Sequence, residues 1–364
     1  MPAPLSRRTL LLSAALTLTA AATAACGGGG DTSGGSAGRT TVRIAYQAIP
    51  NADLVVKNQR LLEESLPDAD VKWVKFESGG DVNTAVIAGA VDFGLAGSSP
   101  VTKGLSAPLD IPYKVVWIHD LIGDNEALVA KSGIGSVKDL AGRKVATPFG
   151  STAHYSLLAA LSAAGVDPPA VRIIDLQPQD ALAAWKRGDI DAAYVWTPTL
   201  GELAKDGKVL VSSRELAGQG KPTADLGVVT NAFAAKHPEV VTAWIKAQDR
   251  AVAQARTAPD QAARSIGAEL GLPPEEAKRQ LSQLVLLSAK EQTAPQYLGT
   301  PGAPGALAAN LHDAAVFLKG QKAVDAVPDE AVFLVPGTAA VLAFAFAAFT
   351  GFESTVIYRR EARD

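Results

Sequence analysis

Two pairs of hydroxyl side chains stand where they could bind an anion. Ser98 and Ser99 lie at the start of one predicted helix, and Ser151 and Thr152 lie at the start of another. The first N–H groups of a helix point outward and the helix dipole is positive there, so such a start attracts negative charge. Two starts that face one another could bind one anion from both sides. The alternative for either pair is that its hydroxyl groups only cap the helix.

His154 and Tyr155 follow the second pair and are the next candidates for chemistry. The chain has four His and one Cys, and their spacing matches no metal site. No Gly-rich segment continues into the Gly-Lys-Ser/Thr of a phosphate-binding loop. We therefore expect no metal, no cofactor and no catalytic residue. We interpret His154 and Tyr155 as cleft-wall residues or hydrogen-bond donors to a ligand.

The elements that must position these residues alternate between strands and helices. Short β-branched or apolar runs predict strands at 41–46, 71–76, 91–96, 115–118, 127–130, 144–147, 171–176, 192–196 and 226–230. Helical patterns fill the intervals and most of the chain after 230. Strands separated by helices indicate an α/β fold with mostly parallel sheets, and two such sets indicate two lobes. Ligands in such folds bind at the carboxyl ends of the strands.

Length and composition narrow the class of protein. The 364 residues carry a formal net charge of −3, and 48% of them are hydrophobic. This length suits two domains, and the hydrophobic content excludes a disordered chain. A single Cys excludes a disulfide framework. Because the chain has no long run of Lys or Arg, we expect no nucleic-acid partner.

Residues 1–25 have the pattern of an export signal. A basic start with Arg7 and Arg8 precedes a short apolar run and then small residues. The pattern suits general secretion or twin-arginine export. The small residues end at Cys26 and resemble a bacterial lipobox, in which this Cys carries the lipid. The Gly/Ser-rich residues 26–39 predict a flexible tether. We therefore expect an exported protein, lipid-anchored at the extracytoplasmic face of the cell membrane.

An ordered set of segments resembles the substrate-binding proteins of ABC importers for taurine and related sulfonates, within the nitrate/sulfonate/taurine group. The segments are 46–47, 76–82, 97–100, 148–158, 176–178, 185–196 and 236–241, within a resemblance that covers about 40–325. It implies a bilobed periplasmic-binding-protein fold, type II-like, that closes on its ligand. The implied outer lobe is 40–126 plus 225–330 and the inner lobe is 127–224, with hinge crossings near 125–126 and 225–226.

The resemblance implies taurine or a related small sulfonate as the ligand. A sulfonate stays ionised and needs donors such as the two helix starts, whereas the ammonium of taurine needs a carboxylate or an aromatic face. Asp225 matches a position that resembles the family's amine partner, with hinge hydrogen bonding as the alternative. Trp196 could place its indole face on the cation or be plain core. Gln47 and Asp81 are further candidates, and Asp81 could instead cap its helix.

Partners and rival functions also follow from the resemblance. It implies a permease and an ATPase as partners of a monomeric binding protein that is not an enzyme. The alternatives are a binding protein for aliphatic sulfonates, nitrate or a thiamine-pyrimidine precursor, and a pyrimidine-synthase-like enzyme that uses His154. An amine partner at Asp225 favours taurine over nitrate and over sulfonates without an amine.

Residues 331–364 do not fit this resemblance. The segment 331–352 is 22 residues long without a charge, which is enough to span a bilayer. Arg359, Arg360 and Arg363 follow and favour a cytoplasmic end. The tail resembles a transmembrane segment of amino-acid permeases, although one helix cannot form a transport site. We interpret it as a gene fusion, a truncation or a reading-frame artefact, with a genuine membrane helix or a helix packed on the outer lobe as alternatives.

Overall fold

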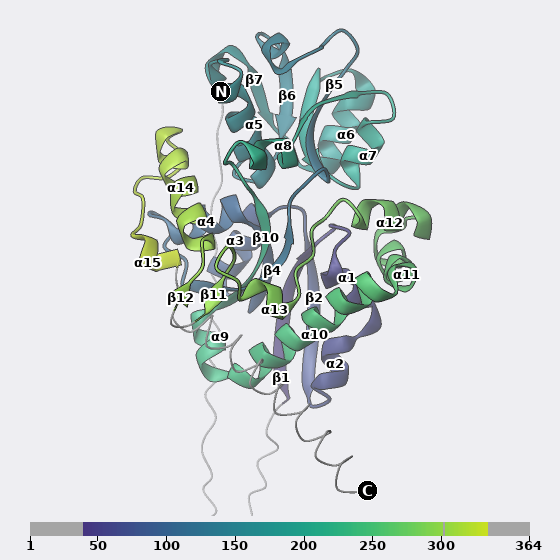
Figure 1. Ribbon diagram of the computed structural model, residues 1–364, viewed down its shortest axis with the longest axis vertical. Helices are drawn as coiled ribbons and strands as arrows, with labels where there is room; N and C mark the ends of the chain where they lie inside the picture. The colour runs from purple at the N-terminus through teal and green to yellow at the C-terminus, as the bar shows by residue number, and fades with distance from the viewer. Residues whose placement is uncertain (1–38, 301–302, 334–364) are drawn as a thin grey trace, which may run out of the picture. The chain divides into compact units, whose positions relative to one another are not determined.

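Two five-stranded sheets form the framework of the computed structural model, which describes residues 39–300 and 303–333 (Figure 1). The first sheet has the order β2-β1-β3-β10-β4 and the second has the order β7-β6-β8-β5-β9. The strands of the first are β1 (Thr40–Gln47), β2 (Ala69–Phe76), β3 (Phe93–Gly97), β4 (Tyr113–Leu121) and β10 (Ala224–Thr230). Those of the second are β5 (Glu126–Ala130), β6 (Lys144–Thr147), β7 (Arg172–Asp175), β8 (Ala192–Trp196) and β9 (Lys208–Ser212). The chain thus leaves the first sheet after β4 and returns to it with β10.

Both sheets mix parallel and antiparallel pairs. In the first, β1 pairs in parallel with β2 and β3, and β10 runs antiparallel to β3 and β4. In the second, β6 pairs in parallel with β7 and β8, and β5 runs antiparallel to β8 and β9. The predicted α/β class is confirmed, but the antiparallel share is larger than the alternating pattern predicted. The two reversed strands, β5 and β10, are the ones that follow the crossings between the sheets.

Helices connect the strands and extend the chain after β10. Before the second sheet lie α1 (Ala52–Gln59), α2 (Leu61–Ser65), α3 (Gly79–Ile87) and α4 (Ser98–Leu105). Between β5 and β10 in the chain lie α5 (Thr152–Ala163), α6 (Pro178–Arg187), α7 (Thr199–Leu203) and α8 (Ser213–Gly218), with short 3-10 turns at Val137–Leu140 and Pro168–Ala170. After β10 come α9 (Asn231–Lys236), α10 (Pro238–Thr257), α11 (Pro259–Leu270), α12 (Pro274–Leu281), α13 (Ala289–Gln292), α14 (Leu307–Gly320) and α15 (Glu330–Phe333). A two-strand ladder, β11 (Gly299–Thr300) with β12 (Ala303–Pro304), precedes α14.

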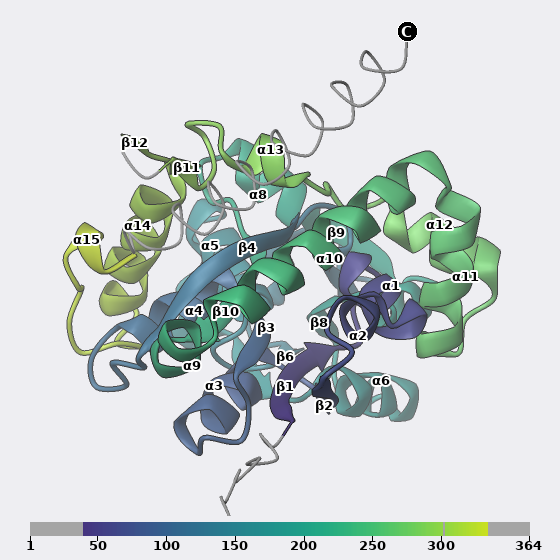
Figure 2. The same ribbon diagram turned by 90° about the horizontal axis from the view of Figure 1, so that it is seen from below.

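Alternating side chains of the first sheet enter two different cores. Ile44 packs in a cluster with Trp244 of α10, whereas its neighbour Ala45 packs with residues of α3, α4 and α14. Figure 2 shows α10 running across one face of this sheet. The second sheet behaves likewise, because Leu128 packs toward α5 and Val129 packs toward α6 and α7. This period of two is what buries both faces of each sheet.

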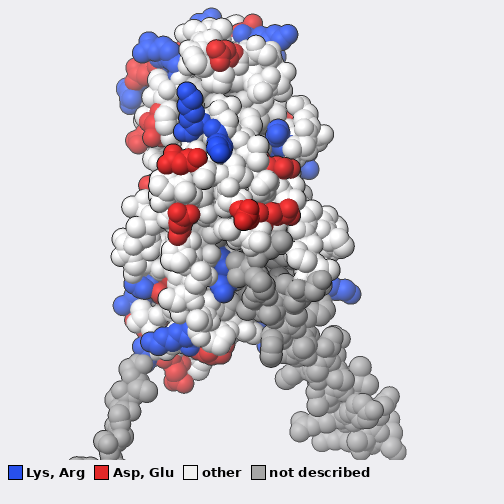
Figure 3. Space-filling view, turned by 90° about the vertical axis from the view of Figure 1, so that its left-hand side faces the viewer, with Lys and Arg blue, Asp and Glu red and all other residues white. Residues whose placement is uncertain are grey.

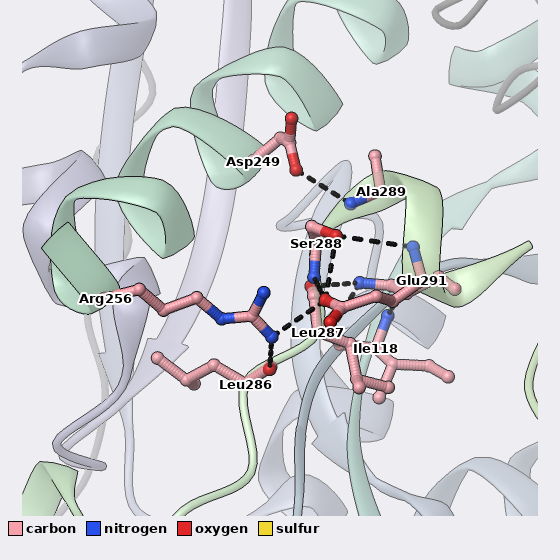
Figure 4. Close-up of polar contacts among 9 residues, drawn as sticks. Ile118, Asp249, Arg256, Leu286, Leu287, Ser288, Ala289 and Glu291 are labelled. Carbon is pink, nitrogen blue, oxygen red and sulfur yellow. Dashed lines mark hydrogen bonds and ion pairs between the residues drawn. The ribbon is translucent and has the colours of Figure 1, made fainter.

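Residues 285–292, which follow α12 and are called the fastened segment below, are held against β4 and α10 by polar contacts (Figure 4). Leu121 and Val285 exchange backbone hydrogen bonds as an isolated bridge. The Arg256 guanidinium donates to the Leu286 carbonyl and forms an ion pair with Glu291 at 2.7 Å, while Asp249 accepts the N–H of Ala289 at 2.7 Å. The last residue of α13 also exchanges two hydrogen bonds with Ile118 of β4. This fastened segment therefore supports the end of the strand from which the chain crosses to the second sheet.

Three local predictions differ from the structure. The helical interval predicted between the strands at 41–46 and 71–76 holds two helices, because Arg60 adopts φ 56° between them. The helix predicted to start at Ser98 and Ser99 is α4, and its N-cap is Gly97 rather than one of these hydroxyl residues. The strand predicted to stop at Ile118 continues through Leu121. That extension has a consequence for the site, because it places Asp120 within β4.

Several expectations fall on residues outside the described ranges. The export signal, Cys26 and most of the tether precede Arg39, and the apolar tail continues beyond Phe333. None of the helices within 39–300 and 303–333 combines the length and the apolar composition that crossing a membrane requires. The lobe boundaries implied by the resemblance stay a prediction.

Candidate functional site

A small polar pocket lies where residues of the two sheets meet. Its lining is Gln47, Ile49, Gly79, Gly97, Pro100, Ile122, Asn125, Glu126, Ser151, Thr152, Trp196 and Asp225. Strands β1, β3 and β8 each supply their last residue, which is the edge where such sheets bind ligands. The free space is about 20 Å³, enough for about one water molecule. A larger solute therefore requires the two walls to move apart.

The start of α5 forms one wall. Ser151 is its N-cap, and the Ser151 hydroxyl accepts a hydrogen bond from the N–H of His154 at 3.1 Å. Thr152 is the first helical residue, and both side chains are buried. The N–H groups of this first turn have no intrahelical acceptor, and the dipole of a twelve-residue helix adds positive potential. This wall can therefore bind a negative group.

The opposite wall approaches α5 closely at Gly97, the N-cap of α4. A Cβ at this position would lie 2.5 Å from Cγ2 of Thr152, closer than two carbon atoms can approach. Only glycine therefore fits between the two helix starts. The predicted pairing of two helix starts across a cleft is thus seen in the backbone, with Gly97 and Pro100 of the α4 start, rather than its two Ser side chains, lining the pocket.

Glu126, the first residue of β5, places a buried carboxyl group in the same pocket. It accepts hydrogen bonds from Thr152 Oγ1 at 2.5 Å, Ser213 Oγ at 2.7 Å and Ser156 Oγ at 3.4 Å. Burial raises the pKa of Glu126 to about 6, and the three hydroxyl donors limit the rise. The pocket therefore holds a partly desolvated acid beside the helix start.

Asp225 on β10 adds a second carboxyl group to the lining, and a third lies next to it. Asp120 on β4 is the direct cross-strand partner of Asp225. Asp120 is fully buried and Asp225 is 5% exposed. Burial raises the pKa of both, and each is raised further by neighbouring acids. Within the described part of the chain, no Lys, Arg or His forms an ion pair with Asp120, Asp225 or Glu126.

Two further predicted residues lie in this pocket. The Gln47 side chain is buried and donates to the carbonyl of Leu95 at 3.0 Å, which fixes its orientation. Trp196 ends β8 and is 9% exposed, so most of its ring belongs to the core of the second sheet while part lines the pocket. An indole beside two carboxyl groups offers an additional surface for a cation.

Three of the predicted residues line a different cavity. Ser98, Ser99 and Tyr155 contribute to a space of about 160 Å³ bounded by β4, the start of β10 and α14. None of its lining residues is charged, and Ser98 Oγ accepts the backbone N–H of Ala224 at 3.3 Å. The sequence could not separate these residues from the polar pocket, because Ser98 directly follows Gly97 in the chain.

Asp81 and His154 line neither of these two cavities. Ser78, not Asp81, is the N-cap of α3: its Oγ accepts the Asp81 N–H at 3.4 Å and donates to the Asp81 carboxylate at 2.8 Å, so Asp81 supports the cap. The His154 ring stacks on Phe149 at 4.7 Å, and its Nδ1 accepts the N–H of Gly150 at 3.2 Å. Burial lowers the pKa of His154 to about 4, so the ring is neutral at physiological pH.

The arrangement can hold a small molecule that carries both signs of charge. The start of α5 can bind an anionic group, and the carboxyl groups of Glu126 and Asp225 can bind a cationic group. Residues 39–300 and 303–333 contain no group of three or more His, Cys, Asp or Glu arranged to hold a metal. The sequence reasoning missed Glu126 and Asp120 as site residues. The available signal for Asp120 was an acidic residue two positions after the buried run 115–118.

Comparisons with known proteins show which family this chain is similar to. The family model described as NMT1/THI5 like matches residues 68–262. The chain is 44% identical over 211 residues to the taurine-binding periplasmic protein of Escherichia coli K12, covering 58% of this chain and 65% of that protein. It is 33% identical over 230 residues to a putative aliphatic sulfonates-binding protein of Bacillus subtilis 168, covering 61% of this chain and 67% of that protein. The match thus spans just under two thirds of the taurine-binding protein.

A solved structure shares the fold. The periplasmic aliphatic sulphonate binding protein SsuA from Escherichia coli superposes with a TM-score of 0.65 at 24% identity, covering 80% of this chain and 96% of that one. The relatives named above are binding proteins rather than enzymes. None of these matches bears out the resemblance of the C-terminal tail to a permease segment.

Proposed function

We propose that this chain, which belongs to the NMT1/THI5-like family, is the extracytoplasmic solute-binding protein of an ABC importer and captures taurine or a related small amino-sulfonate. The observation that carries the proposal is the pocket in which the start of α5 faces Glu126 and Asp225. Its helix start suits a sulfonate, and its unpaired acids suit an ammonium. The identity to a taurine-binding protein supports the same ligand.

Capture requires relative movement of the two sheets. The pocket has room for about one water, whereas taurine has a sulfonate, two carbons and an amine. We expect the crossings near 125–126 and 225–226 to act as the hinge, so that the solute enters an open form and the walls then close on it. The closed protein would deliver its ligand to a permease whose ATPase supplies the energy.

The anchor is a separate part of the proposal. We propose that Cys26 carries a lipid after export and that 26–39 tethers a monomeric binding domain to the membrane. Replacement by C26S should move the protein from the membrane fraction to the soluble fraction. Retention of the C26S variant after carbonate extraction would instead assign the anchor to the apolar tail 331–364.

On the face drawn in Figure 3, basic and acidic side chains are interspersed, so this face offers no continuous basic surface to a nucleic acid.

The first test is calorimetric titration of residues 38–333 with a panel of ligands. We expect micromolar or tighter binding of taurine and much weaker binding of ethanesulfonate, nitrate and sulfate, because only taurine satisfies both ends of the pocket. Binding of longer aliphatic sulfonates in preference to taurine would support the second candidate, which the relative from Bacillus subtilis favours. Failure to bind any sulfonate would overturn the proposal.

A further inference from the structure

Two of the buried acids form a pair whose charge no Lys, Arg or His among residues 39–300 and 303–333 compensates by an ion pair. Asp120 and Asp225 are opposite each other on neighbouring antiparallel strands, which places their side chains on the same face. Only Asp225 lines the pocket, so Asp120 lies behind it. Two like charges opposite each other in a sheet repel, and burial strengthens the repulsion because little water screens it.

The hydrogen-bond partners of the pair are unequal. Asp120 Oδ2 accepts the Asn51 side-chain amide at 3.2 Å, whereas Asp120 Oδ1 is buried without a partner among the described residues. No hydrogen bond to the Asp225 carboxyl group is present in the same part of the chain. A proton on Asp225 would remove one of the two charges and provide a donor for the unpartnered Asp120 Oδ1. The geometry therefore favours one shared proton while the pocket is empty of ligand.

None of the charged groups described around the pair supplies a positive charge that would compensate Asp120 and Asp225 in place of that proton. Glu126 on β5 is a further acid. His119, next in the chain, contacts Trp244 in the core below α10. On the crossing itself, Arg214 pairs with Asp124 at the surface. On α1, Asp53 accepts the Gln248 amide.

We propose that Asp120 is a positioning residue that keeps a proton on Asp225 in the unliganded site, and that the ligand's ammonium group replaces this proton. The exchange balances charge: one R–NH₃⁺ enters, the O–H bond of Asp225 breaks, and one H⁺ leaves to solvent. Both carboxylates are then ionised beside a cation, which stabilises them. This inference rests on the proposed function, because it requires a cationic ligand.

The test is calorimetry of taurine binding near pH 7 in two buffers of different ionisation enthalpy, whose difference in observed heat gives the protons released. We expect release of up to about one proton per taurine, since the pair shares one. Ethanesulfonate, at concentrations where it binds, should release none because it has no amine. The D120N variant should release less than half as much as the wild type, and the matched exchange D139N, at an exposed carboxylate, should leave the release unchanged.

A second measurement does not depend on the folding of a variant. Taurine affinity of the wild-type protein should increase with pH, by up to about tenfold per pH unit, where the pair still holds its proton. Taurine binding without proton release and without this pH dependence would overturn the inference and leave the proposed function intact. Equal release by D120N and wild type would also overturn it. Absence of taurine binding would overturn both.

Discussion

The polar pocket and the fastened segment of Figure 4 both contain acidic side chains, but the pKa of the acid is shifted in opposite directions in the two regions. In the fastened segment, Glu291 pairs with Arg256 and caps α13, and these contacts lower its pKa to about 2. In the pocket, Glu126 is desolvated without a cation, and its pKa rises to about 6. A paired acid stabilises the fold, whereas an unpaired buried acid destabilises it unless something binds. The comparison distinguishes acidic residues that stabilise the fold from acidic residues that are available to bind a ligand.

The largest effect should come from removing the carboxyl group that lines the pocket. D225A should weaken taurine binding by about 10- to 100-fold, because a hydrogen bond to a charged group contributes about 1.5–3 kcal/mol. Ethanesulfonate binding should change by less than about threefold, since it lacks the ammonium. Calorimetric titration of both ligands measures the difference. Equal losses for the two ligands would show that Asp225 serves the hinge.

The next effect concerns stability in the absence of ligand. The folded-state pKa of Glu126 is above its ordinary value of 4.5, so folded protein binds the proton more tightly than unfolded protein. The stabilising contribution is complete below pH 4.5 and is lost as the pH rises through about 6, a change of about 2 kcal/mol. Urea unfolding across this window should show stability falling with pH in the wild type and falling less in E126Q. An identical pH slope in E126Q would contradict the assignment.

A smaller effect should follow from breaking the fastened segment. R256A should lower the free energy of unfolding by about 1 kcal/mol, because the Arg256–Glu291 pair is half exposed, and lower Tm by about 2–4 °C. The pair's stabilising contribution is present above the ordinary pKa of Glu291 and is lost as the pH falls toward 2, opposite in sign to Glu126. Taurine affinity should stay within about twofold of wild type. A large loss of affinity would show that this segment controls the hinge.

The smallest effect is expected at His154. Its ring is neutral, stacks on Phe149 and lines neither cavity described above, so H154A should change taurine affinity by less than about threefold. Product analysis after long incubation with sulfonates and pyrimidine precursors should show no turnover by either form. Turnover by the wild type that H154A abolishes would favour the enzyme alternative.

Much of the fold was accessible from the sequence because the signals are local. The strands that contain Tyr46, Phe76 and Trp196 alternate or run apolar, and the caps at Ser78 and Ser151 mark helix starts. The end of β4 was not accessible. His119 and Asp120 are polar, so a local pattern ends the strand at Ile118, whereas pairing with β10 continues it to Leu121.

For the site, local sequence patterns indicate which chemistry is present: hydroxyl groups and N–H groups at helix starts, and an acid at position 225. Which of these groups share a pocket depends on the fold. It brought Gly97 against Thr152, set Ser98 and Ser99 toward another cavity, and placed Asp120 behind Asp225. The reason is that contacts between strands far apart in the chain depend on sheet order and register, which no local pattern encodes, and only those contacts bring the acids together without a cation.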